Sequence, residues 1–377
     1  MNFDLTDERQ MLQDSLRRFL TDHYSNEKIR ALVDSDNGYS TETWAGLAEM
    51  GVIGALFNES DGGYGGAGFD VALVFEELGR VGAVDPLLDT AVLCGGVLAA
   101  LGNDEQKALI ETIVEGSLQM AMAHAEPQSR YELARVETKV GRDGSAYVLS
   151  GQKSVVVNAS AADFLIISAR TEDDVASQAG IGLFLIPADA EGLTIQDYPL
   201  SSGGRAAEVV LESVHVDADA LLGNEGEGFD TLELVHARAT VAISAEALGL
   251  METIRALTTD YLKIRKQFGK PLGKFQVLQH RMADLLVEIE QARSAVINLA
   301  GHVDGARDAR EKHVSATKNL IGIVGKLVAE ESIQMHGGIG MTEEYELGHL
   351  AKRLIMIDHR LGDATHHLER FIDLAVA

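Results

Sequence analysis

The sequence predicts an α+β protein in which two helical blocks flank a β block. The expected divisions are an N-terminal helical domain over residues 1–117, a central antiparallel β-barrel or sandwich over 118–223, and a C-terminal four-helix bundle over 224–377. Two observations predict this order. The spacing of apolar residues changes from a helical period to alternation and back, and 377 residues with 46 % apolar side chains suffice for more than one core.

The N-terminal block carries amphipathic helical patterns. The first follows Thr6 and places these apolar residues on one face: Met11, Leu12, Leu16, Phe19 and Leu20. Residues 41–50, 69–78 and 103–114 show the same spacing. The glycine-rich stretch NESDGGYGGAGFD follows no predicted strand and lacks Gly-Lys-Ser/Thr, so we interpret it as a connection between helices rather than a phosphate-binding loop.

The central block has the pattern of short β-strands. Four β-branched runs, YVLSGQKSVVVNAS, DFLIISART, GIGLFLIPA and AAEVVLESVHV, are separated by Gly, Asp, Asn and Ser. In the last run Val209 and Leu211 alternate with Glu208, Val210 and Glu212, as expected for a strand with one buried face. Because no helical pattern intervenes, these strands predict a compact antiparallel barrel or sandwich.

The C-terminal block contains long helices with continuous apolar seams. One seam is formed by Leu278, Met282, Leu285, Ile289, Ala292, Val296 and Leu299. A second helix repeats the spacing from Thr317 to Glu331, and a third is expected over residues 231–263. We interpret these seams as the core of a helix bundle rather than as ligand sites.

Composition excludes several classes of function. The net charge of −26 argues against binding to nucleic acid or an anionic membrane, because both are polyanions. No run approaches about 18 uninterrupted apolar residues, the length that spans a bilayer, and the acidic N-terminus lacks the features of a signal peptide. Cys94 is the only cysteine, which excludes an intramolecular disulfide, and its apolar neighbours predict a buried thiol. We therefore expect a cytoplasmic protein.

Four motifs connect this order of blocks to a known family. They are AHAEPQSR at residues 123–130, DALLGNEGEGF at 219–229, RKQFGKPLGKFQ at 265–276 and QMHGGIGMTEEY at 334–345. Together they resemble the acyl-CoA dehydrogenase family over essentially the whole chain. Within that family the chain looks most like the small subunit of pimeloyl-CoA dehydrogenase and related heteromeric enzymes.

The resemblance implies that FAD binds at a subunit interface, between the β domain of one chain and the helical bundle of another. Arg265 would contact the FAD pyrophosphate, because a planar guanidinium matches the geometry of phosphate oxygens. Contacts with the adenosine portion are implied for Phe268, Gln276, Gln334, Gly337 and Gly338. The two glycines would let the main chain approach the cofactor closely.

The family chemistry needs a carboxylate that removes the α-proton of an acyl-CoA thioester while the β-hydrogen leaves as hydride to the flavin. The straight-chain enzymes place a glutamate followed by Gly-Thr at the position where this chain has Asp363, Ala364 and Thr365. Asp363 is therefore the candidate base, and Thr365 and His367 are candidate flavin contacts. Aspartate is shorter, and a misplacement of about 1 Å can cost on the order of a hundredfold in rate. Asp363 also suits the N-cap of the last helix, and both roles can hold.

Two further interpretations concern neighbouring candidates. Some family members take the base from the first long helix of the bundle, where this chain has Ala239. Glu246 lies seven residues further on the same helix face and is a reserve candidate, although a hydrogen bond to another helix is its simpler role. His366 and His367 do not predict a metal site, because adjacent helical residues point about 100° apart and no third ligand has matching spacing.

The β block departs from the family pattern. Residues 125–131 read Ala-Glu-Pro-Gln-Ser-Arg-Tyr where the family has Thr-Glu-Pro-Gly-x-Gly-Ser, and residues 155–157 are valines where a Trp-x-Thr normally contacts the flavin ring. It therefore stays open whether this chain's β domain holds the ring. Arg130 would contact an acyl carboxylate or a CoA phosphate, or is simply an exposed loop residue.

The leading hypothesis is an FAD-dependent acyl-CoA dehydrogenase, or a subunit of a heteromeric one, acting on an acyl chain that is bulky or ends in a carboxylate. The resemblance implies an electron-transfer flavoprotein as redox partner, and either a homo-oligomer or a heterotetramer with a related subunit. Two alternatives stay open. One is a non-catalytic partner subunit, and the other is a flavin oxidase of the same fold resembling nitroalkane oxidase, which uses an aspartate at this position.

Overall fold

The computed structural model describes residues 5–33, 35–172 and 174–376. They form two compact units, each assembled from separate stretches of chain. The first consists of Met1–Arg30, Ala67–Ala83 and Thr240–Ala377, and the second of Ala31–Gly66 and Val84–Ala239. The three-domain division at residues 117 and 223 remains a prediction.

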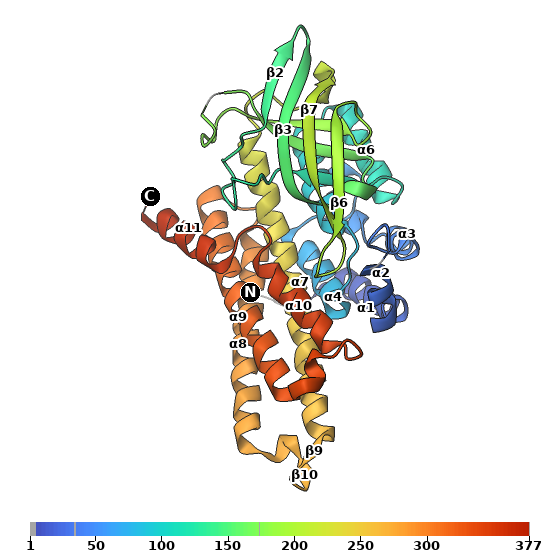
Figure 1. The fold of residues 1–377 in the computed structure, drawn as a ribbon, viewed down its shortest axis with the longest axis vertical. Coiled ribbons are helices and arrows are strands. Elements are labelled where there is room, and N and C mark those ends of the chain that lie inside the picture. Colours follow the sequence, from blue (N-terminus) through green and yellow to red (C-terminus); the bar gives the residue numbers. More distant parts are fainter. Residues whose placement is uncertain (1–4, 34, 173, 377) are drawn as a thin grey trace. The chain divides into compact units, whose positions relative to one another are not determined.

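The first unit is helical. Its helices are α1 (Asp7–His23), α4 (Gly68–Val81), most of α7 (Phe229–Ile264), α8 (Gln276–His302), α9 (Arg307–His336), α10 (Leu347–Asp358) and α11 (Ala364–Val376). Helices α8 and α9 run side by side (Figure 1). The predicted seam of α8 is core, because it buries Leu285, Ile289, Ala292, Val296 and Leu299.

Helices α4 and α7 pack closely because each contributes a glycine at the contact. A Cβ atom at Gly79 would lie 2.1 Å from the carbonyl oxygen of Glu246, and one at Gly249 would lie 2.1 Å from that of Glu76. Only glycine permits this backbone approach. Ion pairs such as Arg17–Glu77, with 2.6 Å between nitrogen and oxygen, join α1 to α4.

The second unit contains one eight-stranded sheet with the order β6-β7-β3-β2-β4-β5-β8 and β1 beside β4. The strands are β1 (Met120–Ala123), β2 (Lys139–Asp143), β3 (Ala146–Val157), β4 (Phe164–Arg170), β5 (Ile181–Pro187), β6 (Leu193–Pro199), β7 (Arg205–Val216) and β8 (Leu221–Leu222). The predicted β domain is confirmed. Its pairings are antiparallel except that β4 pairs in parallel with β1 and, at one residue pair, with β2.

The second unit includes the start of α7 (residues 229–239), and its other helices precede the sheet in sequence. They are α3 (Thr41–Glu49), the π-helix η3 (Leu88–Gly95), α5 (Gly96–Leu101) and α6 (Asp104–Val114), while α2 (Asn26–Val33) crosses the boundary between the units. Cys94 lies in η3 and is buried, as predicted, and burial raises the pKa of its thiol. The glycine-rich stretch forms the connection before α4, also as predicted.

Among the described helices, α7 is long and apolar enough to cross a membrane. However, 83 % of its apolar window is buried inside the protein, as in the core helix of a globular fold.

Candidate active site

A short basic hairpin follows α7. Arg265 leads into β9 (Lys266–Gln267), which pairs with β10 (Lys270–Pro271). The two-residue turn is formed by Phe268 and Gly269 with φ angles of 52° and 78°, the geometry of a type I′ hairpin turn. The Phe268 side chain is 90 % exposed, and its ring centroid lies 6.2 Å from that of Phe275. A large aromatic side chain this exposed is available to a ligand or another chain.

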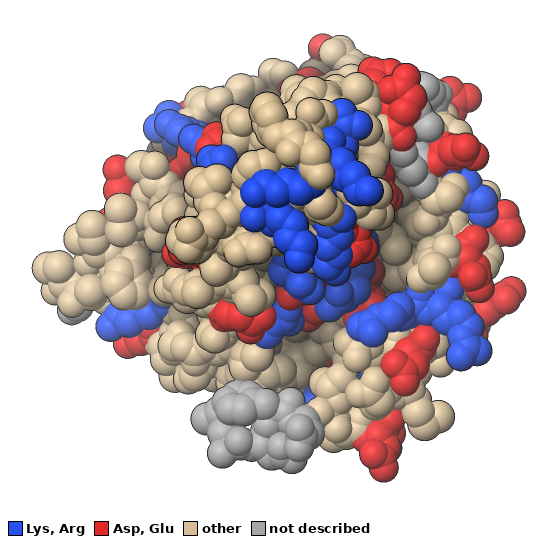
Figure 2. All heavy atoms as spheres, turned by 90° about the horizontal axis from the view of Figure 1, so that it is seen from below, with Lys and Arg blue, Asp and Glu red and all other residues tan. Residues whose placement is uncertain are grey.

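Basic side chains surround this hairpin. The exposed members are Lys263, Arg265, Lys266, Lys270 and Lys274. The hairpin lies lowest in Figure 1, and the view from below shows Lys and Arg side chains gathered near the middle of that face (Figure 2). In a chain with a net charge of −26, this local positive charge suits an anionic ligand.

The motif at residues 334–345 reaches the same end of the first unit. The His336 ring stacks on Tyr261 of α7 with 4.4 Å between centroids, and its Nε2 lies 3.2 Å from the Tyr345 hydroxyl. Tyr261 is one helical turn before Arg265, and the Arg265 amide donates a hydrogen bond of 2.8 Å to the Tyr261 carbonyl. The structure therefore brings together the two motifs for which the family resemblance implies FAD contacts.

The glycines of that motif leave room for a ligand. Gly337 has φ 69° and ψ −147°, a conformation that is essentially restricted to glycine. A Cβ atom added at Gly337 or Gly338 would meet no atom within 4 Å. Gln334 is exposed beside them. An exposed arginine, an exposed aromatic ring and an open glycine backbone fit the pyrophosphate and adenosine portions of FAD.

Asp363 lies in the loop between α10 and α11. Its Oδ1 accepts a hydrogen bond from the His366 amide at 2.8 Å, so it caps α11 as one of the two interpretations predicted. The side chain is half-buried rather than turned fully to solvent. Its role as a base stays a prediction.

The two candidate flavin contacts after Asp363 differ in exposure. Thr365 is exposed, whereas His367 is buried and its Nε2 lies 2.8 Å from the Leu361 carbonyl oxygen. Burial lowers the pKa of His367 to about 3, so the imidazole is neutral at physiological pH and Nε2 donates to the carbonyl.

The Asp363 loop and the basic hairpin lie far apart in one chain. Lys318 of α9 contacts the loop, whereas His336 at the end of α9 packs near the hairpin. About 27 Å of helix separates these two residues at a rise of about 1.5 Å per residue. Figure 1 accordingly shows α11 and the hairpin at opposite ends of α8 and α9.

Glu246, the reserve candidate, is buried and paired. Its Oε1 accepts a hydrogen bond at 2.6 Å from Nε of Arg353, which lies on α10. Glu246 therefore forms a hydrogen bond between helices α7 and α10, which was the simpler of its two interpretations. Ala239 is buried on the same helix.

The three valines at the end of β3 lie at a strained bulge in the second unit, where Val155 is exposed and Val156 is buried in the core. The ladder between β3 and β7 shifts register between Lys153 and Val156, and Val155 has a φ of 54° with a side chain 55 % exposed. Glu208 holds this bulge, because its carboxylate accepts from the Ser154 hydroxyl at 2.5 Å and the Val155 amide at 3.3 Å. The Val155 side chain offers no hydrogen bond and its amide already donates to Glu208, so this position supplies no polar contact to a flavin ring.

A buried charge pair next to this bulge was not predicted. Lys153 Nζ donates to Glu126 Oε1 at 2.7 Å and to Ser168 Oγ at 3.0 Å, and neither charged side chain is exposed. Burial lowers the pKa of Lys153 to about 8, while the charge of Glu126 opposes this shift. The sequence offered one signal for this pair, namely that Lys153 occupies a position of β3 that faces the core.

Arg130 lies on an exposed loop with its guanidinium 5.3 Å from the Tyr131 ring centroid.

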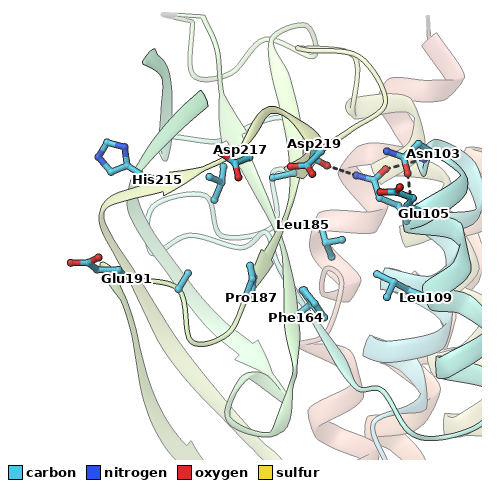
Figure 3. Close-up of a pocket in the computed structure, with 14 residues that line it drawn as sticks. Asn103, Glu105, Leu109, Phe164, Leu185, Pro187, Glu191, His215, Asp217 and Asp219 are labelled. Carbon is cyan, nitrogen blue, oxygen red and sulfur yellow. Dashed lines mark hydrogen bonds between the residues drawn. The ribbon is translucent and has the colours of Figure 1, made fainter. Parts of the chain in front are cut away.

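A separate pocket of 490 Å³ opens in the second unit (Figure 3). Apolar residues line its lower part in this view, namely Leu109, Phe164, Leu185 and Pro187, and acidic residues line its edge, namely Glu105, Glu191, Asp217 and Asp219. None of the predicted site residues lines it.

In the part of the chain that the structure describes, no group of three His, Cys, Asp or Glu residues could hold a metal ion.

Comparison with known proteins identifies similarity along almost the whole chain. Models of the N-terminal, middle and C-terminal domains of acyl-CoA dehydrogenases match residues 6–116, 121–214 and 224–357. The short-chain-specific acyl-CoA dehydrogenase of Megasphaera elsdenii is 31 % identical over 358 residues, which is 92 % of each chain.

Two solved structures are similar over nearly their whole length. A variant of the steroid ACAD Tcur3481-Tcur3483 has a TM-score of 0.88 at 32 % identity and covers 98 % of each chain. A chain in the structure of the electron transferring flavoprotein of Acidaminococcus fermentans has a TM-score of 0.91 at 26 % identity and covers 100 % of each chain.

Proposed function

The chain belongs to the acyl-CoA dehydrogenase family, and we propose that it is a subunit of an FAD-dependent enzyme that desaturates a bulky acyl-CoA thioester between Cα and Cβ. One observation carries this proposal. The first unit presents an open basic end formed by the hairpin and the 334–345 motif, and it holds a half-buried carboxylate, Asp363, at its other end.

The open end is proposed to bind the adenosine diphosphate portion of FAD. Arg265 is proposed to donate hydrogen bonds to pyrophosphate oxygens, and Phe268 to cover the adenine. Gln334 and Gln276 add polar contacts, while Gly337 and Gly338 allow close approach of the backbone. When bound, FAD supplies the acceptor for the hydride that leaves the substrate Cβ.

Asp363 is proposed to act as the base. Its carboxylate takes the proton from the substrate Cα, and the electron pair of that C–H bond becomes the new carbon–carbon double bond as the hydride leaves Cβ. The hydrogen bond from the His366 amide and the N-terminus of α11 stabilise the ionised carboxylate before reaction. Thr365 and His367 follow on the same helix and are proposed to lie beside the flavin.

The active site is proposed to need more than one chain. About 27 Å of α9 separates the two ends, so a single flavin would take Arg265 and Asp363 from different chains. Exposed apolar side chains on α8, α9 and α11 offer a surface for such an assembly: Leu286, Val287, Ile323, Leu327, Leu368, Phe371, Ile372 and Val376.

A related subunit rather than a second copy is the proposed partner. The exposed Val155 at the β3 bulge offers no hydrogen-bonding side chain to a flavin ring, so a sister chain with a complete β domain is proposed to hold the ring. The similarity to the steroid ACAD Tcur3481-Tcur3483, whose name joins two designations, supports a heteromeric enzyme and a bulky, ring-bearing acyl group. An electron-transfer flavoprotein is the proposed redox partner, and the cytoplasm the proposed location.

The test is the visible spectrum and the FAD content of the protein, purified alone and with a co-expressed sister subunit. We expect little FAD in the chain alone, one FAD for every two chains in the complex, and anaerobic bleaching by a ring-bearing acyl-CoA. A colourless complex that no acyl-CoA bleaches would overturn the proposal. Peroxide release with nitroethane, without turnover of CoA esters, would instead favour the oxidase alternative.

A further inference from the structure

A buried lysine lies directly beneath the loop that carries Asp363. Lys318 is on α9, its side chain is fully buried, and its Nζ donates to the carbonyl oxygens of Asp358 at 2.9 Å and Gly362 at 2.6 Å. The Asp358 carbonyl lies at the end of α10, where the loop begins. The Gly362 carbonyl lies near the end of the loop, immediately before Asp363. The single ammonium group therefore joins both ends of the loop to α9.

Neighbouring side chains fix the other side of Asp363. Asn319 Nδ2 donates to the Ala364 carbonyl at 2.8 Å, and Asp358 Oδ1 accepts from the Ala364 amide at 3.0 Å. Gly322 makes room for this arrangement, because a Cβ there would lie 2.0 Å from Asp358 Oδ1. The backbone is thus held both before and after Asp363.

The loop needs such contacts because its backbone is strained. Leu361 has a φ of 55° and Gly362 a φ of 102°, and a leucine in the left-handed region is uncommon. Conformations of this kind persist only where surrounding contacts enforce them. The hydrogen bond between His367 Nε2 and the Leu361 carbonyl adds a further contact to the strained residue.

An ammonium group is a costly way to fill this space. Burial lowers the pKa of Lys318 to about 8, and the charges of Asp358 and Asp363 partly oppose that shift while Arg360 adds to it. His367 on α11 is a further titratable group near Lys318, and the charge of Lys318 adds to the lowering of the His367 pKa. A methionine would fill a similar volume without a buried charge. Stability of the core alone therefore does not account for a lysine here.

We infer that Lys318 is a positioning residue, which holds the Asp363 carboxylate at the reaction site and whose positive charge stabilises the ionised base. This inference rests on the proposed function, because it assigns Lys318 a task only if Asp363 is the base. The two parts of the role are separable. The hydrogen bonds set the position of the loop, and the charge sets the pH at which the base is ready.

Two substitutions in the reconstituted holoenzyme separate these parts. Lys318→Gln keeps an amide that can donate to the carbonyls but removes the charge, whereas Lys318→Met removes both. Lys326→Met, at an exposed position of the same helix, is the matched control. The measurements are the exchange of the substrate α-proton in D₂O without an electron acceptor, the pH profile of turnover, and hydrogen exchange of the peptide covering residues 355–370.

Lys318→Met is expected to slow α-proton exchange on the order of a hundredfold and to accelerate backbone exchange in the loop. Lys318→Gln is expected to retain most of the maximal rate but to move the acidic limb of the profile to higher pH, because the carboxylate loses a neighbouring cation. A merely structural lysine would not move that limb.

Unchanged exchange and an unchanged pH profile in both variants, with a normally active wild type, would overturn the inference about Lys318 alone. A wild-type holoenzyme that exchanges no α-proton would overturn the proposed base, and the role of Lys318 with it.

Discussion

The two ends of the first unit hold their candidate residues in opposite ways. At the hairpin end, Arg265 and Phe268 are exposed, and the backbone of Gly337 has no atom near the position of a side chain. At the loop end, Lys318 and Asn319 hold the backbone on both sides of Asp363. One end is open to a ligand or another chain, and the other is organised by the chain itself.

This difference separates binding from chemistry. Proton transfer requires a base held to within a fraction of an ångström, so contacts within one chain are the more reliable support. A clamp on pyrophosphate tolerates exposed side chains, because the ligand itself completes its hydrogen bonds and the charge attraction acts over a longer range. Substitutions at the hairpin end and at the loop end test this difference.

The largest expected effect is that of Asp363→Asn in the reconstituted enzyme. Asparagine caps a helix as well as aspartate does, so the loop should stay folded while the base is lost. We expect turnover to fall by about 10²- to 10⁴-fold, with FAD content and thermal stability retained. Stopped-flow measurement of flavin reduction by the acyl-CoA checks this.

Asp373→Asn, at an exposed position of the same helix, is the control and should leave the reduction rate unchanged. If Asp363→Asn also leaves the rate unchanged, Asp363 is only a helix cap and the loop end carries no chemistry. If Glu246→Ala leaves turnover unchanged as well, the chain is the non-catalytic partner of the sister subunit.

At the hairpin end, Arg265→Ala is expected to weaken FAD binding by about 10- to 100-fold, since a charge-assisted contact contributes about 1.5–3 kcal/mol. Arg265→Lys should recover only part of this, because an ammonium lacks the planar fork. Fluorescence titration of the FAD-free complex measures both. Lys312→Ala removes an exposed positive charge elsewhere on α9 and is the control; equal losses from Lys312→Ala and Arg265→Ala would show that only overall charge matters.

Local periodicity predicted the helical and β blocks because burial of one face repeats along each element. Leu285 and Ile289 of the α8 seam and Val209 and Leu211 of β7 are buried for that reason. The parallel pairing of β1 with β4 was not predicted, since alternation identifies a strand but not its neighbour. The helix-capping role of Asp363 could be predicted from its residue type and position alone.

The contacts that organise the site were harder to predict from the sequence. Lys318 lies on the buried face of α9 near Ser315 and Ile321, and a lysine on a buried helix face is itself a signal. Its partners are backbone carbonyls of a strained loop, however, and residue spacing does not encode their positions. The register shift that turns Val155 outward depends likewise on Glu208, a residue of another strand.

The smallest effect concerns the pH dependence of stability at the loop end. Burial lowers the pKa of His367 to about 3 from an ordinary value near 6.5. Between these values the unfolded chain binds a proton that the folded chain does not, so stability present above pH 6.5 is lost as the pH falls toward 3. This one group should contribute a slope of about 1.4 kcal/mol per pH unit.

The free energy of unfolding in urea, measured from pH 4.5 to 7 at constant protein concentration, tests this contribution. His367→Gln should flatten the acidic slope by about one proton, while His280→Gln, at an exposed position of α8, controls for the loss of an imidazole. Equal slopes in His367→Gln and wild type would mean that the folded loop admits a proton at His367. The loop would then open readily to solvent, and the contrast between an organised end and an open end would fail.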